Sequence, residues 1–174
     1  VVGELGADLV AASEGLASFS GAARRVERRG SAAGVELVDD YAHLPTEIRA
    51  ALAAGRSGDW GRVVVVFQPH RYSRTEALLE GFATAFDDAD LLVLTEIYAA
   101  GEAPREGVDG TALYDAVRSA RPRADVRWAP TLPDVAELLA AELRPGDLCM
   151  TVGAGDVTTV ADLVLALLER GGSR

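Results

Sequence analysis

Two short segments of the sequence concentrate side chains that can do chemistry. One is residues 39–47, DDYAHLPTE, and the other is residues 68–75, QPHRYSRT. Together they contain both histidines of the chain. Histidine changes its charge near neutral pH, and the arginine guanidinium binds carboxylates and phosphates through a fixed fork of donors. These two segments are therefore the first candidates for a binding or catalytic site.

Arg71 and Arg74 are three residues apart at the expected start of a helix. That spacing places both guanidinium groups on one side, near a helix terminus that already favours anions. The pattern predicts a site for a carboxylate or a phosphate. The alternative is that both are surface arginines paired with Glu76 or Glu80. His43 has a similar alternative, in which it is a loop histidine with a satisfied ring.

The elements that must position these segments follow from the alternation of apolar runs and helical periods. Strands are expected at residues 35–38, 62–67, 91–96, 126–129 and 148–152, and helices at residues 46–54, 73–86, 111–120, 133–143 and 157–170. This alternation predicts an α/β, Rossmann-like fold, with a mostly parallel sheet and helices on both faces. Ligands bind such sheets beyond the C-terminal ends of the strands, where both segments fall.

Several helices carry start signals. Ser73 and Glu76 have the spacing of a capping box, Thr131 precedes a proline in a first turn, and Asp156 is placed to accept the amides of the last helix. In that last helix one apolar stripe is expected to face the sheet. The stripe consists of Val160, Leu163, Val164, Leu167 and Leu168.

Residues 153–156, GAGD, follow the last expected strand. A dinucleotide-binding fingerprint needs a third glycine, and Thr158 stands in its place. A tight strand-to-helix turn with an Asp cap explains the two glycines equally well, and nucleotide binding is the alternative. Residues 98–110 form a long loop rich in turn formers, which is expected to border the ligand and contains no cluster of metal ligands.

The N-terminal part of the chain differs from the rest. Residues 1–20 are expected to be a linker or the end of a preceding domain, and residues 21–174 to form one domain. An edge strand or hairpin leading to Gly30 and Gly34 would place four arginines in water. These are Arg24, Arg25, Arg28 and Arg29. Solvated edge charge is the preferred interpretation, and phosphate binding is the alternative.

Composition excludes several classes of function. A net charge of −10, from 27 acidic and 17 basic residues, argues against binding to nucleic acid or to anionic membranes. Every basic residue is an arginine, whereas a phosphate-binding loop of the GxxxxGK[ST] type needs a lysine. The longest apolar run, residues 63–67, is far shorter than the ~18 residues of a membrane span, and the start of the chain is unlike a signal peptide. A cytoplasmic protein is therefore expected.

Cys149 is the only cysteine, so a disulfide framework is excluded. It lies in the apolar run of residues 147–152. We therefore predict a buried, inert thiol, with a catalytic thiol as the alternative.

The succession of residues 39–47 (DDYAHLPTE), 65–75 (VVFQPHRYSRT) and 98–104 (YAAGEAP) closely resembles the C-terminal domain of the Mur ligases. The resemblance is to the branch that adds L-alanine to UDP-N-acetylmuramate, and the run from His70 to Arg74 favours that branch over ligases that reuse a murein tripeptide. Residues 153–156 are similar to the family's final strand-to-helix turn. One departure is Leu44, where many family members carry a second histidine.

The resemblance implies a Rossmann-like, amino-acid-binding domain of an ATP-dependent ligase of peptidoglycan precursor synthesis. In that family ATP phosphorylates the muramoyl carboxylate, and the amine of alanine attacks the acyl phosphate. The resemblance places Tyr41, His43, Arg71 and Arg74 around the amino acid and acyl phosphate, with the last three as catalytic residues. It places Asp40 near the nucleotide ribose.

The same resemblance sets the expected cofactors and partners. ATP and Mg²⁺ would be bound mainly by the central domain of the same polypeptide, and residues 1–20 look like the end of that domain. An N-terminal domain would hold UDP-N-acetylmuramate, so this domain alone is expected to be inactive and to contain no metal site. The alternatives are a non-catalytic Rossmann-like module that binds a small anion, and a nucleotide-dependent oxidoreductase, which the missing third glycine disfavours.

Overall fold

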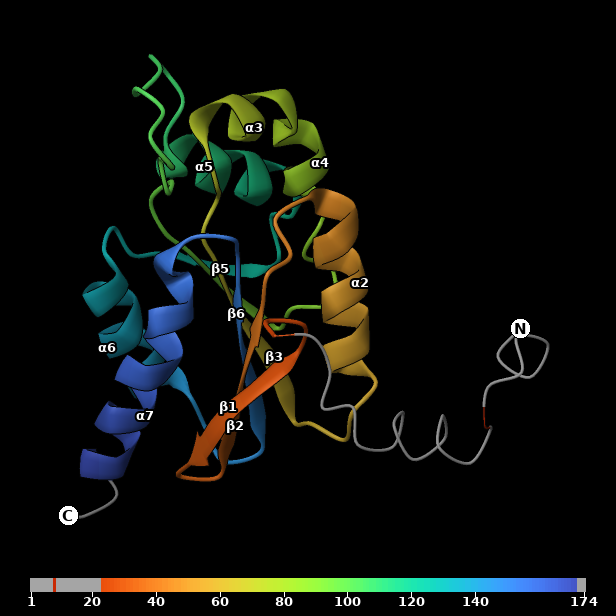
Figure 1. The fold of residues 1–174 in the computed structure, drawn as a ribbon, viewed down its shortest axis with the longest axis vertical. Coiled ribbons are helices and arrows are strands. Elements are labelled where there is room, and N and C mark those ends of the chain that lie inside the picture. Colours follow the sequence, from red (N-terminus) through yellow and green to blue (C-terminus); the bar gives the residue numbers. More distant parts are fainter. Residues whose placement is uncertain (1–7, 9–22, 172–174) are drawn as a thin grey trace.

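A six-stranded sheet forms the middle of the computed structural model, which describes residue 8 and residues 23–171 (Figure 1). Its strands are β1 (Glu27–Ala32), β2 (Val35–Asp40), β3 (Arg62–Phe67), β4 (Leu91–Leu94), β5 (Asp125–Trp128) and β6 (Asp147–Val152). They lie in the order β1-β2-β6-β3-β4-β5. Only the β1–β2 pair is antiparallel. The predicted mostly parallel sheet is confirmed.

The central strands are mostly apolar and are buried along almost their whole length, because both faces of the sheet are covered. In β3 the five residues after Arg62 are all buried, and so are all six residues of β6. A strand of a half-exposed sheet would instead alternate apolar and polar residues. This continuous apolar pattern is what identified residues 62–67 as a parallel strand.

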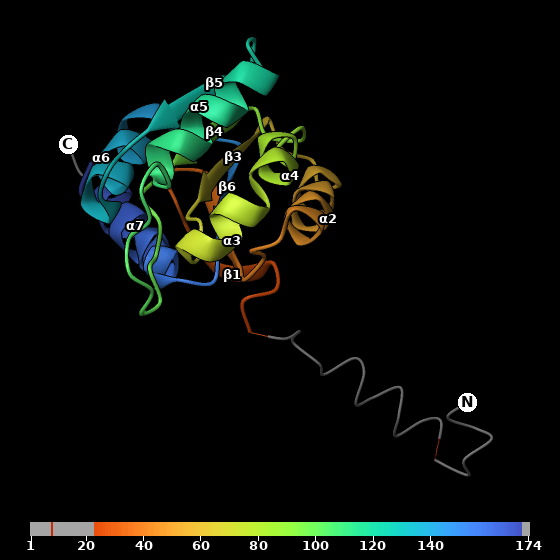
Figure 2. The same cartoon turned by 90° about the horizontal axis from the view of Figure 1, so that it is seen from above.

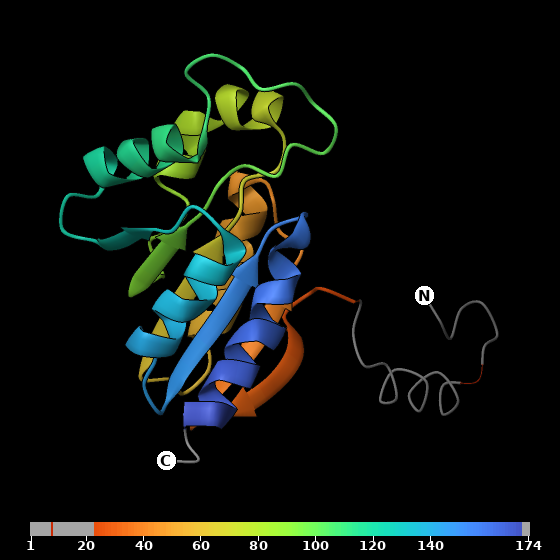
Figure 3. The same cartoon turned by 90° about the vertical axis from the view of Figure 1, so that its left-hand side faces the viewer.

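Helices cover both faces of the sheet, as predicted (Figure 2). On one face lie α2 (Pro45–Arg56), α3 (Tyr72–Ala77), α4 (Leu79–Ala83) and α5 (Gly110–Ala120). On the other lie α6 (Leu132–Glu142), the 3₁₀ turn η2 (Asp156–Thr158) and α7 (Thr159–Gly171), seen side by side in Figure 3. The two apolar clusters correspond to the two faces: Phe67 and Phe82 belong to the first, and Val64 and Leu139 to the second.

The helix predicted over residues 73–86 is wrong in its length and in its cap. Two short helices, α3 and α4, meet at Leu78. Ser73 does not form a capping box with Glu76. Its amide and hydroxyl donate to the carboxylate of Glu102, at 2.9 and 2.6 Å, and Glu76 pairs with Arg105 instead. The long loop brings in a carboxylate that local spacing does not reveal.

The start of the last helix also differs from the prediction. The Asp156 carboxylate accepts from the side-chain amide of Gln68, at 2.8 Å, rather than from a backbone amide of the helix. The carbonyl oxygen of the same Gln68 side chain accepts from the Val157 amide, at 3.1 Å. The helix start is thus held by a side chain from the loop after β3. The predicted cap of α6 is confirmed, because Thr131 accepts from the Asp134 amide.

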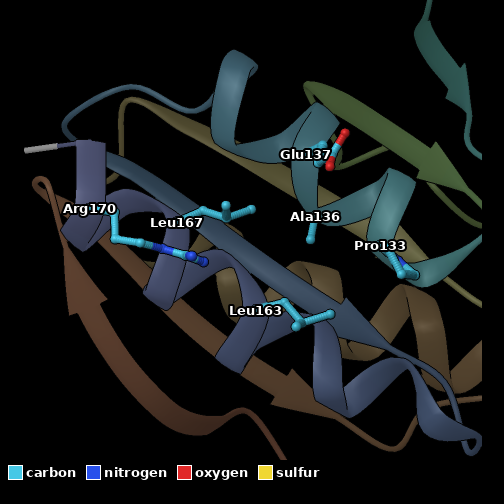
Figure 4. Close-up of a pocket in the computed structure, with 6 residues that line it drawn as sticks. All are labelled: Pro133, Ala136, Glu137, Leu163, Leu167 and Arg170. Atoms are coloured by element: carbon cyan, nitrogen blue, oxygen red, sulfur yellow. The ribbon is translucent and has the colours of Figure 1, made fainter.

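The apolar stripe of α7 faces the sheet only in part. Val160 and Val164 are fully buried, whereas Leu163 is 41% exposed. Leu163 lies instead on a surface groove of about 160 Å³ between α6 and α7 (Figure 4). The groove is lined by Pro133, Ala136, Glu137, Leu163, Leu167 and Arg170, none of which is a predicted site residue.

The predicted hairpin of β1 and β2 is present, but its arginines divide into two kinds. The side chains of Arg25 and Arg28 are about half or more exposed, as expected. Arg24 and Arg29 are mostly covered, because they bind Asp39 and Asp162. Solvated edge charge is therefore the wrong interpretation for these two.

Two further expectations concern the N-terminal residues and the absence of a membrane-spanning helix. The assignment of residues 1–20 to a linker or a preceding domain lies outside the described residues, apart from Asp8. Among the helices that the structure describes, none has both the length and the apolar character to cross a bilayer.

The Cys149 thiol lies fully buried in β6, and this burial, with the nearby Asp147 carboxylate as a smaller cause, raises its pKa to about 12. The nucleophilic thiolate is therefore scarce at neutral pH. We expect no reaction of the native protein with Ellman's reagent near about pH 8, and one thiol per chain after unfolding in urea. Full labelling of the native protein within minutes would contradict this burial.

Candidate functional site

The C-terminal ends of the parallel strands bring the two sequence segments together. The loop after β3 is tied to the loop after β4 by two backbone hydrogen bonds, from Arg71 to the Tyr98 carbonyl and from Tyr98 to the Pro69 carbonyl, both 2.8 Å. Residues 98–109 and α3 consequently extend beyond the same end of the sheet (Figure 3). The long loop therefore lies beside the loop after β3, and its contact with a ligand stays a prediction.

Four aromatic rings cross this edge in a continuous row. The centroid of Tyr41 lies 5.4 Å from that of His43, which lies 6.2 Å from that of His70, which stacks on Tyr98 at 5.5 Å. We call these four side chains the aromatic row. Tyr41 and Tyr98, its two ends, are 38% and 39% exposed, so the row is open to solvent. The structure thus joins Tyr41 and His43, which are predicted site residues, with His70 and Tyr98, which lie in the candidate loops but were not predicted as site residues.

His43 is held by its own loop. Its Nδ1 lies 3.0 Å from the Tyr41 carbonyl and 3.4 Å from the Glu47 carboxylate. Both partners can only accept, so Nδ1 carries the proton, and in the neutral ring the lone pair belongs to Nε2. Within residues 23–171 that Nε2 has no hydrogen-bond partner. The alternative of a loop histidine with a satisfied ring therefore holds for Nδ1, whereas Nε2 is available to accept a hydrogen bond within these residues.

Glu47 is the acceptor that orders this loop. Burial alone would raise the pKa of its carboxyl group, but hydrogen bonds from the His43 and Leu44 amides and the charge of His43 together lower it. Glu47 is therefore ionised at neutral pH and keeps His43 at the start of α2.

His70 has the opposite arrangement. Its Nδ1 lies 3.1 Å from the Arg74 guanidinium, which can only donate, so Nδ1 must accept. Burial and then the nearby charges of Arg74, Arg71 and His43 lower the pKa of His70. His70 is therefore neutral at neutral pH, with its remaining proton on Nε2.

The two predicted arginines are brought to the same place but differ in their surroundings. Arg74 is partly buried and also donates to the His70 carbonyl, at 3.4 Å. Arg71 is exposed, has a left-handed φ of 73°, and its side chain makes no hydrogen bond or ion pair within the described part of the chain. The alternative pairing with Glu76 or Glu80 is not observed. Arg71 is therefore the cation that remains available for an anion.

Asp40 is the last residue of β2 and directly precedes Tyr41 of the aromatic row. Its carboxylate is almost fully buried and accepts from the Val26 and Ala42 amides, both at 2.8 Å, with Arg25 at 3.7 Å. It borders a shallow pocket of about 320 Å³ that Arg25 and Glu47 also line. Its contact with a ribose stays a prediction, because the observed contacts are all within the domain.

The glycines of the GAGD turn are explained by close packing. A Cβ atom at Gly153 would lie 2.8 Å from the Gln68 carbonyl oxygen, and one at Gly155 would lie 2.4 Å from Gln68 Oε1 and 2.7 Å from Cγ of Tyr98. The interpretation as a tight turn accounts for both glycines, although Asp156 does not cap the helix. No group of three or more possible metal ligands occurs among residues 23–171.

This fold and these strand-end loops define a Mur ligase domain. Residues 24–155 match the family described as Mur ligase, glutamate ligase domain, and the chain belongs to that family. The UDP-N-acetylmuramate–L-alanine ligase of Kineococcus radiotolerans is 54% identical over 95% of this chain, which spans 35% of that protein. The corresponding ligase of Anaeromyxobacter dehalogenans strain 2CP-1 is 50% identical over 96% of the chain, which spans 36% of it.

Solved structures agree with this assignment. The UDP-N-acetylmuramate–alanine ligase of Thermotoga maritima superimposes with a TM-score of 0.77 and 26% identity, over 99% of this chain and 36% of that one. A murein peptide ligase of Psychrobacter arcticus shares the fold, with a TM-score of 0.69 and 21% identity, over 91% of this chain and 32% of that one. The chain thus spans about a third of the proteins it matches.

The lowered pKa of His70 predicts an acid-dependent loss of stability. In the unfolded chain His70 takes up its proton near the ordinary pKa of 6.5, before the folded protein does, so stability is complete above that pH and falls as pH drops through the lower folded pKa. We expect the free energy of unfolding in urea to decrease between about pH 7.5 and about pH 5.5, and less so in His70→Gln, whose amide oxygen can still accept from Arg74. An identical decrease in both proteins would remove His70 as its cause.

The packing of Gly155 predicts a selective cost of adding one methyl group. Gly155→Ala would push its Cβ into Gln68 and Tyr98, so we expect a loss of about 1–3 kcal/mol in the free energy of unfolding. Gly171→Ala is the matched control, because a Cβ there has nothing within 4 Å, and it should change stability by less than about 0.5 kcal/mol. Urea unfolding measures both, and equal effects would refute the packing argument.

Proposed function

We propose that this chain is the C-terminal, amino-acid-binding domain of a cytoplasmic ligase that joins L-alanine to UDP-N-acetylmuramate. Two findings support this function: the chain belongs to the Mur ligase family, and its sequence is 50% and 54% identical to those of two ligases with that activity. The observation that carries it is the meeting of Arg71, Arg74 and His43 at one edge of the sheet, beside the aromatic row.

The domain supplies only part of the proposed machinery. The described residues hold no cluster of three ligands suited to a divalent metal, and the only basic residues of the chain are arginines. We therefore assign ATP and Mg²⁺ mainly to the central domain of the ligase and UDP-N-acetylmuramate to its N-terminal domain, with Asp40 and Arg25 near the ribose. When bound, ATP supplies the phosphoryl group that activates the muramoyl carboxylate.

The roles of the site residues follow from their surroundings. Arg71, exposed and with no side-chain hydrogen bond or ion pair among the described residues, donates to the carboxylate of alanine or to the oxygens of the acyl phosphate. Arg74, held by His70, presents a second cation from a fixed position. The free Nε2 of His43 accepts a proton from the attacking amine, and Tyr41 covers the amino acid.

Closure of the other domains over this edge would complete the site. The aromatic row and Arg71 are open to solvent in the isolated domain, so an acyl phosphate there would meet water. Closure excludes that water and strengthens the contacts of the arginines with developing charge. The domain by itself is therefore proposed to be inactive.

The arginines provide the direct test. In the full-length ligase that carries this chain, we expect Arg71→Ala and Arg74→Ala each to lower turnover by about 100-fold, the loss typical of removing a charge-stabilising donor. The measurement is release of phosphate with UDP-N-acetylmuramate, ATP, Mg²⁺ and L-alanine. Arg118→Ala is the control, because Arg118 is exposed on α5 and, within the described part of the chain, its side chain binds Tyr114 and no predicted site residue.

Two outcomes would overturn the proposal. The first is a full-length protein that releases no phosphate in response to L-alanine. The second is turnover in both variants equal to that of the parent. Either result would make these loops structural and favour a non-catalytic module that binds a small anion.

A further inference from the structure

Arg24 is an unusual residue at the beginning of the described domain. It has a left-handed φ of 54°, and its side chain is only 21% exposed although it stands before the first strand. A non-glycine residue in this conformation and a mostly covered guanidinium both carry a free-energy cost. Contacts elsewhere must offset that cost.

The guanidinium of Arg24 binds three groups at once. It donates to the Asp39 carboxylate at 2.6 Å, to the Gly153 carbonyl at 2.6 Å and to the Gly155 carbonyl at 3.4 Å. We call this set the Arg24 clamp. Arg24 lies before β1, Asp39 lies near the end of β2, and the two glycines lie in the turn after β6. The clamp therefore joins three separate segments of the chain.

Asp39 ties the Arg24 clamp to two further side chains. Its side chain is fully buried and also accepts from the Thr151 hydroxyl at 2.6 Å and the Thr158 hydroxyl at 3.0 Å. Arg24 is the only cation paired with it among the described residues. Removing one member of a buried pair leaves an uncompensated charge, so the clamp resists opening.

The clamp reaches both ends of the aromatic row. At one end, the Tyr41 amide donates to the Arg24 carbonyl at 2.7 Å, and the guanidinium carbon lies 5.0 Å from the centre of the Tyr41 ring. At the other end, Gly155, whose carbonyl the clamp holds, packs so closely on Tyr98 that a Cβ would lie 2.7 Å from the ring. His43 and His70 lie between these two ends.

We propose that Arg24 is a positioning residue for the ligase site. It touches no reacting group; it sets the spacing between Tyr41 and the turn that supports Tyr98, and thereby the positions of His43 and His70. The effect of Arg24 on turnover rests on the proposed function. Its effect on the spacing of Tyr41 and Tyr98 rests on the observed contacts. The composition of residues 24–29 favours edge charge, with phosphate binding as the alternative, whereas the observed contacts join Arg24 to the loops of the site.

Two substitutions in the full-length ligase separate the parts of the clamp. Arg24→Met keeps the length of the side chain and removes its charge and donors. Arg24→Lys keeps a cation for Asp39 but cannot reach both glycine carbonyls with a planar fork. Arg28→Ala is the matched control, because Arg28 is exposed on β1 and binds Ser31 and Glu36, which pair near the start of β2, whereas the row begins after its end.

We expect Arg24→Met to lower kcat/KM for L-alanine by at least about tenfold, since small displacements of site groups are costly, while KM for ATP stays unchanged. Arg24→Lys should recover part of the loss, and Arg28→Ala should match the parent. In the same proteins, hydrogen exchange at the Tyr41 and Gly153 amides should quicken in Arg24→Met, with no change in the amides of β3.

Each contrary result overturns the inference. Parental kcat/KM in both Arg24 variants would remove the positioning role. Faster exchange in β3 of Arg24→Lys, equal to that around Tyr41, would show a general loss of stability instead. If the parent ligase itself shows no turnover with alanine, the proposed function fails, whereas unchanged exchange at Tyr41 in both variants would refute the clamp independently.

Discussion

The register of four neighbouring parallel strands is the constraint on which the rest of this structure depends. Val152 at the end of β6 lies opposite Asp40 of β2 on one side and Phe67 of β3 on the other, and Phe67 lies opposite Leu94 of β4. The four strands therefore end at one level. The loops that follow them begin side by side, which is why residues far apart in the sequence contact one another at this edge. A shift of one residue would turn every side chain of a strand to the opposite face.

Two arginines stand at this edge of the sheet, although the chain as a whole is acidic. The net charge is −10, yet the cations Arg71 and Arg74 stand beside a histidine that burial and those same arginines keep neutral. The nearby aspartates, Asp39 and Asp40, are buried under hydrogen bonds and face other partners. The carboxylates of Glu47 and Glu102 also lie at this edge, beside His43 and Ser73, so its affinity for anions depends on Arg71, whose side chain has no hydrogen bond or ion pair within residues 23–171. Such a cation suits the carboxylate and acyl phosphate of the proposed reaction.

Rigidity at the site comes from polar contacts between loops rather than from the apolar core. Gln68 binds both Asp156 and the Val157 amide, Glu102 binds Ser73, and Arg24 binds the GAGD turn. The contacts of Gln68 and Glu102 each join two strand-end loops, and Arg24 joins the segment before β1 to the turn after β6. The core beneath is closely packed and apolar, so it fixes the level of the strand ends, and these contacts fix the geometry above them.

The parallel strands, the covered faces of the sheet and the two segments that carry the site could be predicted from the sequence alone. Those properties depend on local patterns: a continuous apolar run such as residues 63–67, or a helix period such as that of α5. The division of residues 73–86 into two helices, the covered positions of Arg24 and Arg29, and the inclusion of His70 and Tyr98 in the aromatic row were decided only by the tertiary structure. The covered arginines and the aromatic row depend on partners more than 20 residues away, such as Gly153 for Arg24, and so does the start of α3, where Glu102 binds Ser73. Spacing along the chain reports neighbours within a turn or a strand, whereas these partners meet only when the parallel strands align their ends.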